Sequence, residues 1–321
     1  MKKSVIAALT VVLAAASMQV GAEPNWPTRP IKLVNPYPPG AVSDLLARHI
    51  SRILEKELGQ PVIVENKAGA GSNVGSEAVA KAPGDGYTLL NGSSANTANM
   101  SLYSKMQYDT MRDFAPVSLI AEVPNVLVVN SSFPVKSISD LIALAKKDPD
   151  KIAYASAGAG SPAHLAAANF ARMAGIKMRH IAYKGAGPAV SDVMAGHVPM
   201  IFTNYAGVIP GVQSGKLRLI AVGTPARWDL LPNTPTVAES GLPGYTAGAW
   251  YGILAPKSTP PEILARLEKA LQAVKSPESK EAIRKLGAEA VVSSPQALQA
   301  RMSDEIKSFG TLIKDSGITV D

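Results

Sequence analysis

The stretch Ile31–Arg48, IKLVNPYPPGAVSDLLAR, contains a complete strand, turn and helix start. Its apolar beginning, Ile31–Val34, predicts a buried strand, and the Pro/Gly turn at 36–40 ends that strand. Ser43 or Asp44 then opens a helix with one apolar face. The turn brings free backbone N–H groups and the positive end of a helix dipole into one small space, which is typical of an anion-binding corner.

The same succession of strand, small-residue loop and helix recurs along the chain. Short apolar runs predict strands at Ile31–Val34, Val62–Glu65, Thr88–Asn91, Val117–Ile120, Asn125–Val129, Ile152–Ala155, Arg179–Ala182, Met200–Phe202 and Leu217–Val222. Amphipathic patterns predict helices at 42–58, 72–82, 137–147, 162–174, 187–196, 206–214, 260–275, 277–287 and 295–315. Strands that alternate with helices favour parallel sheets covered on both faces.

The order of these elements predicts two α/β lobes. The middle of the chain has its own αβ units, whereas the helical C-terminal part must pack on a sheet built elsewhere. We expect lobe 1 to contain residues 23–123 plus 250–321, and lobe 2 to contain residues 124–249. Two hinge crossings are expected near Val123–Asn125 and Gly248–Gly252. A central ligand cleft between lobes joined in this way is a natural binding site, because strand ends from both sheets face it.

The N-terminus has the pattern of an export signal. Lys2 and Lys3 precede an apolar run, Val5–Ala16, that is too short to span a bilayer, and small residues before Glu23 resemble a cleavage site. We predict cleavage after Ala22, which leaves 321 − 22 = 299 residues for the mature, exported protein. An uncleaved membrane anchor is the alternative.

Composition excludes several classes of protein. The chain has no Cys, so an exported form must rely on its hydrophobic core rather than on disulfides. The formal charge of +7 falls to +5 without the two N-terminal lysines, and the basic residues are dispersed, which argues against nucleic-acid binding. The sequence has no P-loop, no G-x-S-x-G elbow and no metal-ligand spacing among its four histidines. The Gly-rich stretches 69–74 and 158–163 lack the acidic residue of a dinucleotide site. We therefore expect no enzyme, cofactor or metal.

Five loops between a strand end and a helix start are rich in Gly, Ser, Asn and Ala: 37–44, 91–96, 156–162, 183–188 and 203–207. Small residues let a ligand approach the backbone, and Ser or Asn can donate a hydrogen bond or cap a helix. A turn with a helix cap explains each loop taken alone, but five such loops on one side of two sheets favour a shared binding site. The candidate ligand-binding residues are Tyr37, Gly40, Ala41, Ser43, Asp44, Ser93, Ser94, Ala157, Gly158, Ala159, Ser161, Tyr183, Lys184, Asn204 and Trp250.

An ordered series of motifs covers nearly the whole mature chain. They are Trp26–Ile31, Pro38–Asp44, Gly59–Asn66, Gly69–Gly75, Asp85–Leu90, Asp113–Val117, Tyr154–Gly158, Tyr183–Gly185 and Leu230–Val237. In this series the chain resembles the periplasmic solute receptors of tripartite tricarboxylate transporters, often called the Bug family.

The resemblance implies a type II periplasmic-binding-protein fold whose two lobes close on a small mono- or dicarboxylate. It implies that the loops Tyr37–Asp44 and Ser156–Ser161 hold one ligand carboxylate through backbone N–H groups and ordered waters. The implied partners are the ligand and the subunits of a membrane permease, and we expect a monomer. Two alternatives stay open: the same fold as the ligand sensor of a signalling system, and a secreted enzyme whose site is scattered over loops.

Overall fold

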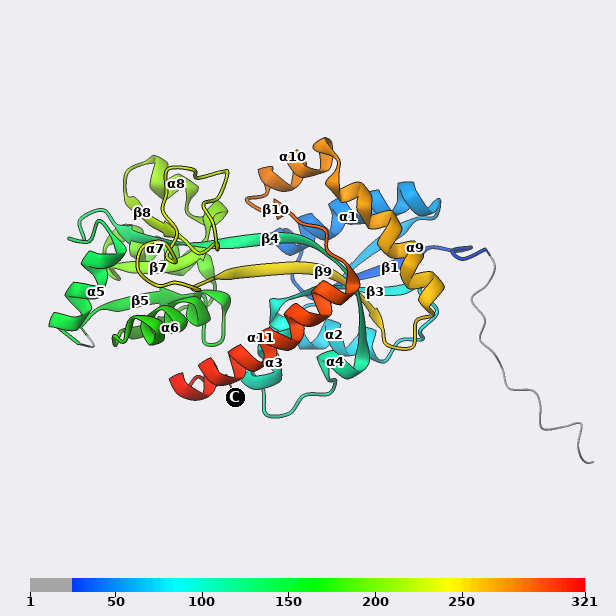
Figure 1. Cartoon of the computed structure of the whole chain (residues 1–321), viewed down its shortest axis with the longest axis horizontal. Helices are drawn as coiled ribbons and strands as arrows, with labels where there is room; N and C mark the ends of the chain where they lie inside the picture. Colours follow the sequence, from blue (N-terminus) through cyan, green and yellow to red (C-terminus); the bar gives the residue numbers. More distant parts are fainter. Residues whose placement is uncertain (1–24, 150, 321) are drawn as a thin grey trace, which may run out of the picture.

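The computed structural model describes residues 25–149 and 151–320, which form two α/β lobes joined by two long strands (Figure 1). The first lobe contains the strands β1 (Ile31–Asn35), β2 (Val62–Asn66), β3 (Thr88–Ser93) and β10 (Glu289–Ala290). The second lobe contains β5 (Ala153–Ser156), β6 (Arg179–Ala182), β7 (Met200–Asn204) and β8 (Leu217–Val222). The connecting strands are β4 (Phe114–Asn130) and β9 (Gly248–Pro256). The two lobes and two crossings are those that the sequence predicts.

Helices cover the sheet of each lobe. The first lobe carries α1 (Val42–Leu58), α2 (Asn73–Ala80), α3 (Ser94–Leu102), α4 (Thr110–Asp113), α9 (Pro261–Leu271), α10 (Pro277–Lys285) and α11 (Pro295–Ser316). The second lobe carries α5 (Ile138–Lys147), α6 (Pro162–Ala174), α7 (Ala186–Ala195) and α8 (Ile209–Gln213). The 3₁₀ helices are η1 (Ala70–Ser72), η2 (Tyr205–Gly207) and η3 (Gln272–Lys275). No helix in the described ranges is both long and apolar enough to cross a membrane.

The sheet is mixed rather than wholly parallel. Its strand order is β2-β1-β3-β9-β4-β7-β5-β6, and β8 and β10 also pair with β4. The strands β1, β2 and β3 are parallel, as are β5, β6 and β7, but every pairing of β4 and β9 is antiparallel. The expectation of purely parallel sheets is therefore wrong for the crossings. The chain enters the second lobe along β4 and returns along β9, so these two neighbours run in opposite directions.

The hinge lies where β4 changes partners. Residues 114–124 of β4 pair with β9, and residues 125–130 pair with β7 and β8. Pro124 lies at the break and has no N–H to donate to the ladder. Gly248 faces it closely, because a Cβ at this position would lie only 2.8 Å from the carbonyl oxygen of Val123. The strand β4 thus changes from the sheet of one lobe to that of the other after Pro124, which pairs with Gly248 of β9.

Each lobe has its own hydrophobic core, and one further cluster is shared. The shared cluster contains Leu102 of α3, Leu165 of α6 and Leu312 of α11, all of them buried. In Figure 1, α11 extends from the first lobe along α3 towards α6, and it contacts both of these helices. The C-terminal helix therefore links the two lobes on one side of the crossing strands.

Most helices and strands of the structure are predicted by the sequence pattern, and a few are not. The bounds of α1, α6, β6 and β8 are those predicted. The runs at 117–120 and 125–129 belong to the single strand β4, whereas β9, β10, α3 and α4 were not predicted. The helix α3 lacks an apolar stripe because its inward face carries polar residues, among them the buried Asn96 and Thr97. The predicted export signal, residues 1–22, lies outside the described residues.

Candidate functional site

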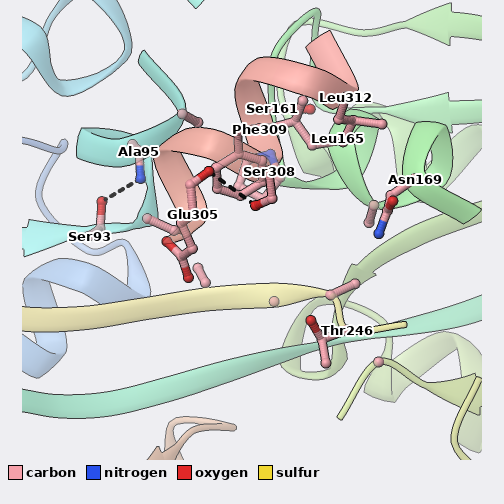
Figure 2. A pocket seen from close by; sticks show the side chains of 18 of the residues that line it. Ser93, Ala95, Ser161, Leu165, Asn169, Thr246, Glu305, Ser308, Phe309 and Leu312 are labelled. Atoms are coloured by element: carbon pink, nitrogen blue, oxygen red, sulfur yellow. Dashed lines mark hydrogen bonds between the residues drawn. The ribbon is translucent and has the colours of Figure 1, made fainter. Parts of the chain in front are cut away.

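A cavity of about 870 Å³ lies at the junction of the two lobes. Its wall comes from the loop after β1, the start of α3, the crossing strands, the loop before α6 with that helix, and α11. Figure 2 shows Ser93 and Ala95 on one side, Ser161 and Leu165 on the other, and Glu305 between them. Both lobes supply residues to this one space, which is the central cleft that the sequence predicts.

The first lobe presents the N-terminus of α3 to the cavity. Ser93 caps this helix, because its Oγ accepts the N–H of Ala95 at 3.3 Å, while Asn96 Oδ1 accepts the N–H of Ser93 at 2.9 Å. The hydroxyl oxygen of Tyr37 lies 2.7 Å from Ser93 Oγ, and burial raises the pKa of Tyr37, so the phenol stays protonated. Hydroxyl donors and a positive helix end favour an anion at this wall.

The second lobe presents the N-terminus of α6 in the same way. Ser161 caps the helix by accepting the N–H of His164 at 3.3 Å, and Pro162 occupies the first helical position. Gly160 has φ +70°, and a Cβ there would lie 2.8 Å from Val320 Cγ1, so this bend requires glycine. A second positive helix end therefore reaches the cavity from the opposite lobe.

Two stacked histidines, His164 and His180, form hydrogen bonds with the loop before α6. The N–H of Gly160 donates to His164 Nδ1 at 3.1 Å, and Ser156 Oγ lies 2.6 Å from His180 Nε2 while it accepts the N–H of Gly158 at 3.1 Å. The two imidazole centroids are 3.7 Å apart. Burial, followed by the neighbouring His180, lowers the pKa of His164 to about 4, and burial lowers the pKa of His180 as well. Both rings are therefore neutral at pH 7, and the unprotonated Nδ1 of His164 is free to accept the N–H of Gly160.

The helix α11 supplies a charged section of the wall. Glu305 accepts hydrogen bonds from Trp250 Nε1 at 2.7 Å and Thr97 Oγ1 at 2.9 Å through Oε2, and from Arg301 Nε at 3.0 Å through Oε1. Arg301 also pairs with Glu122 of β4 through Nη1. One guanidinium thus lies between two carboxylates, and the charges are fixed by bonds to the hinge strands and to α3.

The wall also has an apolar section. Leu102, Leu165, Phe309, Leu312 and Val320 all line the cavity and belong to, or pack against, the cluster shared by α3, α6 and α11. These side chains come from three helices and the C-terminal segment, and Leu102 and Val320 lie close to Gly160 at the start of α6. The cavity therefore has polar groups at the two helix starts and on α11, and an apolar section where α3, α6 and α11 meet.

The structure brings only some of the predicted residues to the cavity. The candidate residues that line it are Tyr37, Ser93, Ser94, Ala159 and Ser161. The candidate residues outside its wall are Gly40, Ala41, Ser43, Asp44, Ala157, Gly158, Tyr183, Lys184, Asn204 and Trp250. The loops after β1, β3 and β5 thus reach this cavity, whereas those after β6 and β7 do not.

Asp44 orders its own loop. Its carboxylate accepts hydrogen bonds from the N–H of Gly40 at 3.0 Å, from Arg48 Nε at 3.0 Å and from Asn66 Nδ2 at 2.8 Å. Burial opposes ionisation, but these three donors hold the pKa of Asp44 below its ordinary value. The first turn of α1 is therefore fixed by this side chain without any ligand.

Two aromatic candidates, Trp250 and Tyr183, lie outside the cavity wall. Trp250 is fully buried in the core of the first lobe, whereas its neighbour Tyr251 lines the cavity. Successive side chains of a strand point to opposite faces, so only one of the two can face the cleft. Tyr183 instead donates its hydroxyl proton to Asp192 Oδ2 at 2.6 Å, and Asn204 caps η2 by accepting the N–H of Gly207 at 3.0 Å.

Sequence reasoning missed the whole contribution of α11. The helical spacing of Leu298, Met302 and Phe309 predicted a packing face, and Leu298 and Met302 are indeed buried in the first lobe. The polar residues Glu305 and Ser308 gave no sign of a cavity, because charged side chains on a helix ordinarily face solvent. Among the described residues, no group of three or more His, Asp or Glu side chains could hold a metal ion.

Comparison with known proteins gives concordant results. The family model described as "Tripartite tricarboxylate transporter family receptor" matches residues 46–318. Protein BugT of Bordetella pertussis is 37% identical over 310 residues, which are 96% of this chain and 95% of BugT. The solved structure of Rpa4515 from R. palustris with adipate has 37% identity and a TM-score of 0.79, and the match covers 92% of this chain and 100% of that one. The periplasmic binding protein BugD has 34% identity and a TM-score of 0.76, with 92% and 100% covered. These matches confirm the periplasmic-binding-protein fold.

Proposed function

Because this chain belongs to the tripartite tricarboxylate transporter receptor family, we propose that it is a periplasmic receptor that captures a small mono- or dicarboxylate between its lobes. One observation carries the proposal: the capped N-termini of α3 and α6, one from each lobe, reach a single cavity at the hinge strands. The adipate bound to Rpa4515 supports a carboxylate as the ligand class.

Capture follows from electrostatics and hinge motion. Each helix start offers N–H groups that lack helical partners, together with about half a positive charge from the helix dipole. Closure of the lobes around β4 and β9 excludes water, and a lower effective dielectric strengthens every N–H contact with the anion. Five residues are proposed to touch the ligand: Tyr37, Ser93, Ser94, Ala159 and Ser161.

The wider setting is proposed from the sequence. The signal peptide would be removed after Ala22, and the mature monomer would deliver its ligand to permease subunits in the membrane without any catalytic step. The lobes would contain residues 23–123 plus 250–321 and residues 124–249, which agrees with a change of strand partners at Pro124. Binding roles for the ten candidate residues outside the cavity wall stay predictions.

Native mass spectrometry of the protein purified from periplasmic extract tests the proposal. We expect a fraction of the mature protein, with residues 1–22 absent, to carry one small organic acid that is released on denaturation. Isothermal titration with the identified acid should then show one site per chain. Retention of only neutral or cationic molecules, or no binding of any carboxylate, would contradict the proposal.

Two further measurements distinguish a transport receptor from a sensor, and a binding protein from an enzyme. In a strain that lacks the gene, loss of ligand uptake supports delivery to a permease, whereas intact uptake with a lost transcriptional response supports a sensor. Incubation of the purified protein with its ligand should return the ligand unchanged, and any turnover would identify an enzyme.

A further inference from the structure

We propose that the ligand of this cavity is a monocarboxylate with an apolar body, and that a second carboxylate on the ligand is disfavoured. The inference rests on the proposed function and narrows its ligand class. It comes from the distribution of charge and apolar surface around the cavity, which combines two helix starts that favour an anion, a group of charged side chains with a net negative charge, and an apolar section.

The two helix starts favour a negative charge, because the capped starts of α3 and α6 contribute the Ser93 and Ser161 hydroxyls and two positive helix ends. The two carboxylates of the cavity wall, Glu122 and Glu305, disfavour one, and Glu305 lies near the first turn of α3, because it accepts a hydrogen bond from Thr97. Four charged side chains line the cavity within the described ranges: Glu122, Arg172, Arg301 and Glu305. Among these four, only the two arginines could pair with the charge of a second ligand carboxylate.

Arg301 is unsuited to that task, because two carboxylates already neutralise it. Its Nε donates to Glu305 and its Nη1 pairs with Glu122, so the three side chains together carry a formal charge of −1. Glu305 is further fixed by Trp250 and Thr97, so it cannot turn away from the cavity without losing these bonds. At an effective dielectric constant of about 20, a unit negative charge within roughly 10 Å weakens binding of another carboxylate about tenfold.

Arg172 is a weak partner for a second ligand carboxylate. It is exposed and already donates to Asn169 Oδ1 at 3.0 Å near the C-terminal end of α6. Solvent therefore screens the attraction of its guanidinium for a ligand.

The remaining wall matches an apolar ligand body. Leu102, Leu165, Phe309, Leu312 and Val320 form the apolar section of the wall where α3, α6 and α11 meet, and they come from both lobes. An acid whose carboxylate binds at the helix starts would place its hydrocarbon part against these side chains. Burial of one methylene group there strengthens binding by up to about fourfold.

Matched pairs of acids test the inference by isothermal titration at pH 7.5. Hexanoate and adipate have the same six-carbon chain and differ in the second carboxylate, and butyrate and octanoate vary the apolar length. We expect the purified mature protein to bind hexanoate at least tenfold more tightly than adipate, and octanoate more tightly than butyrate. Equal or tighter binding of adipate would overturn the inference and leave the proposed function standing. If none of the four acids binds, the inference fails, and the proposed function is then decided by titration with the acid that native mass spectrometry identifies.

A charge-removing variant tests the cause of the discrimination. Glu122→Gln removes one of the two carboxylates beside Arg301 and keeps the Glu305 bonds, so the preference for hexanoate over adipate should fall at least threefold. Glu281→Gln is the matched control, because Glu281 pairs with Arg284 on the exposed surface of α10, and it should leave the preference unchanged. An unchanged preference in Glu122→Gln, with circular dichroism like that of the wild type, would show that the acidic wall does not set the ligand class.

Discussion

Acidification should destabilise the second lobe through the histidine pair behind the loop before α6. His164 Nδ1 accepts the N–H of Gly160 at 3.1 Å, so that nitrogen carries no proton in the folded protein. Burial and the adjacent His180 lower the pKa of His164 from 6.5 to about 4. Between these values the unfolded chain binds a proton that the folded protein excludes. The stabilisation is therefore complete above about pH 6.5 and is lost as the pH falls towards 4.

The size of the effect follows from that interval. At about 1.4 kcal/mol per pH unit, the fall from 6.5 to about 4 corresponds to about 3 kcal/mol. Roughly two thirds of this is lost between pH 7.5 and pH 5, and residual solvent screening reduces it further. We expect His164 to contribute a loss of about 1 to 2 kcal/mol over this range. The groups that face it are His180 and Tyr154, and burial raises the pKa of Tyr154, so that this phenol does not titrate here.

Urea unfolding followed by circular dichroism at a series of pH values measures this contribution. His164→Asn keeps a side-chain oxygen that can accept the Gly160 N–H but removes the titrating group. Whatever its absolute stability, the variant should lose about 1 to 2 kcal/mol less than the wild type between pH 7.5 and pH 5. The two stability curves should run parallel above pH 7.5. Identical pH dependence in both proteins would refute the assignment of a low pKa to His164.

Three further substitutions test the site. Gly158→Val places a branched side chain at φ +128°, where backbone strain costs about 1 to 3 kcal/mol. It should weaken ligand binding at least tenfold in titration while the circular dichroism spectrum stays native. Native affinity would show that this loop does not shape the binding site. Ser161→Ala removes the α6 cap and should lower the unfolding free energy by about 1 kcal/mol in urea, and an unchanged midpoint would mean that the cap contributes nothing. Trp250→Phe leaves Glu305 without its indole donor and should lower the unfolding free energy by about 1 to 3 kcal/mol in the same assay. A smaller loss would count against the Glu305 network.

The sequence by itself determined the local elements and the family. Apolar periodicity located α1 and α6, and Ser-Pro pairs such as Ser161-Pro162 marked helix starts, because capping and the fixed φ of proline act over a few residues. The recurrence of strand, small-residue loop and helix also predicted two lobes with crossings near Val123–Asn125 and Gly248–Gly252. These features depend on neighbours in the chain, so they can be derived from spacing alone.

Only the tertiary structure decided which residues form the cavity. Trp250 and Tyr251 are adjacent in the sequence, yet the register of β9 against β3 and β4 buries the first and exposes the second to the cleft. Glu305 and Phe309 line the cavity because α11 packs across α3 and α6, which lie far away in the sequence. Such contacts depend on how whole elements pack against each other, and the spacing of residues within one helix or strand does not contain that information.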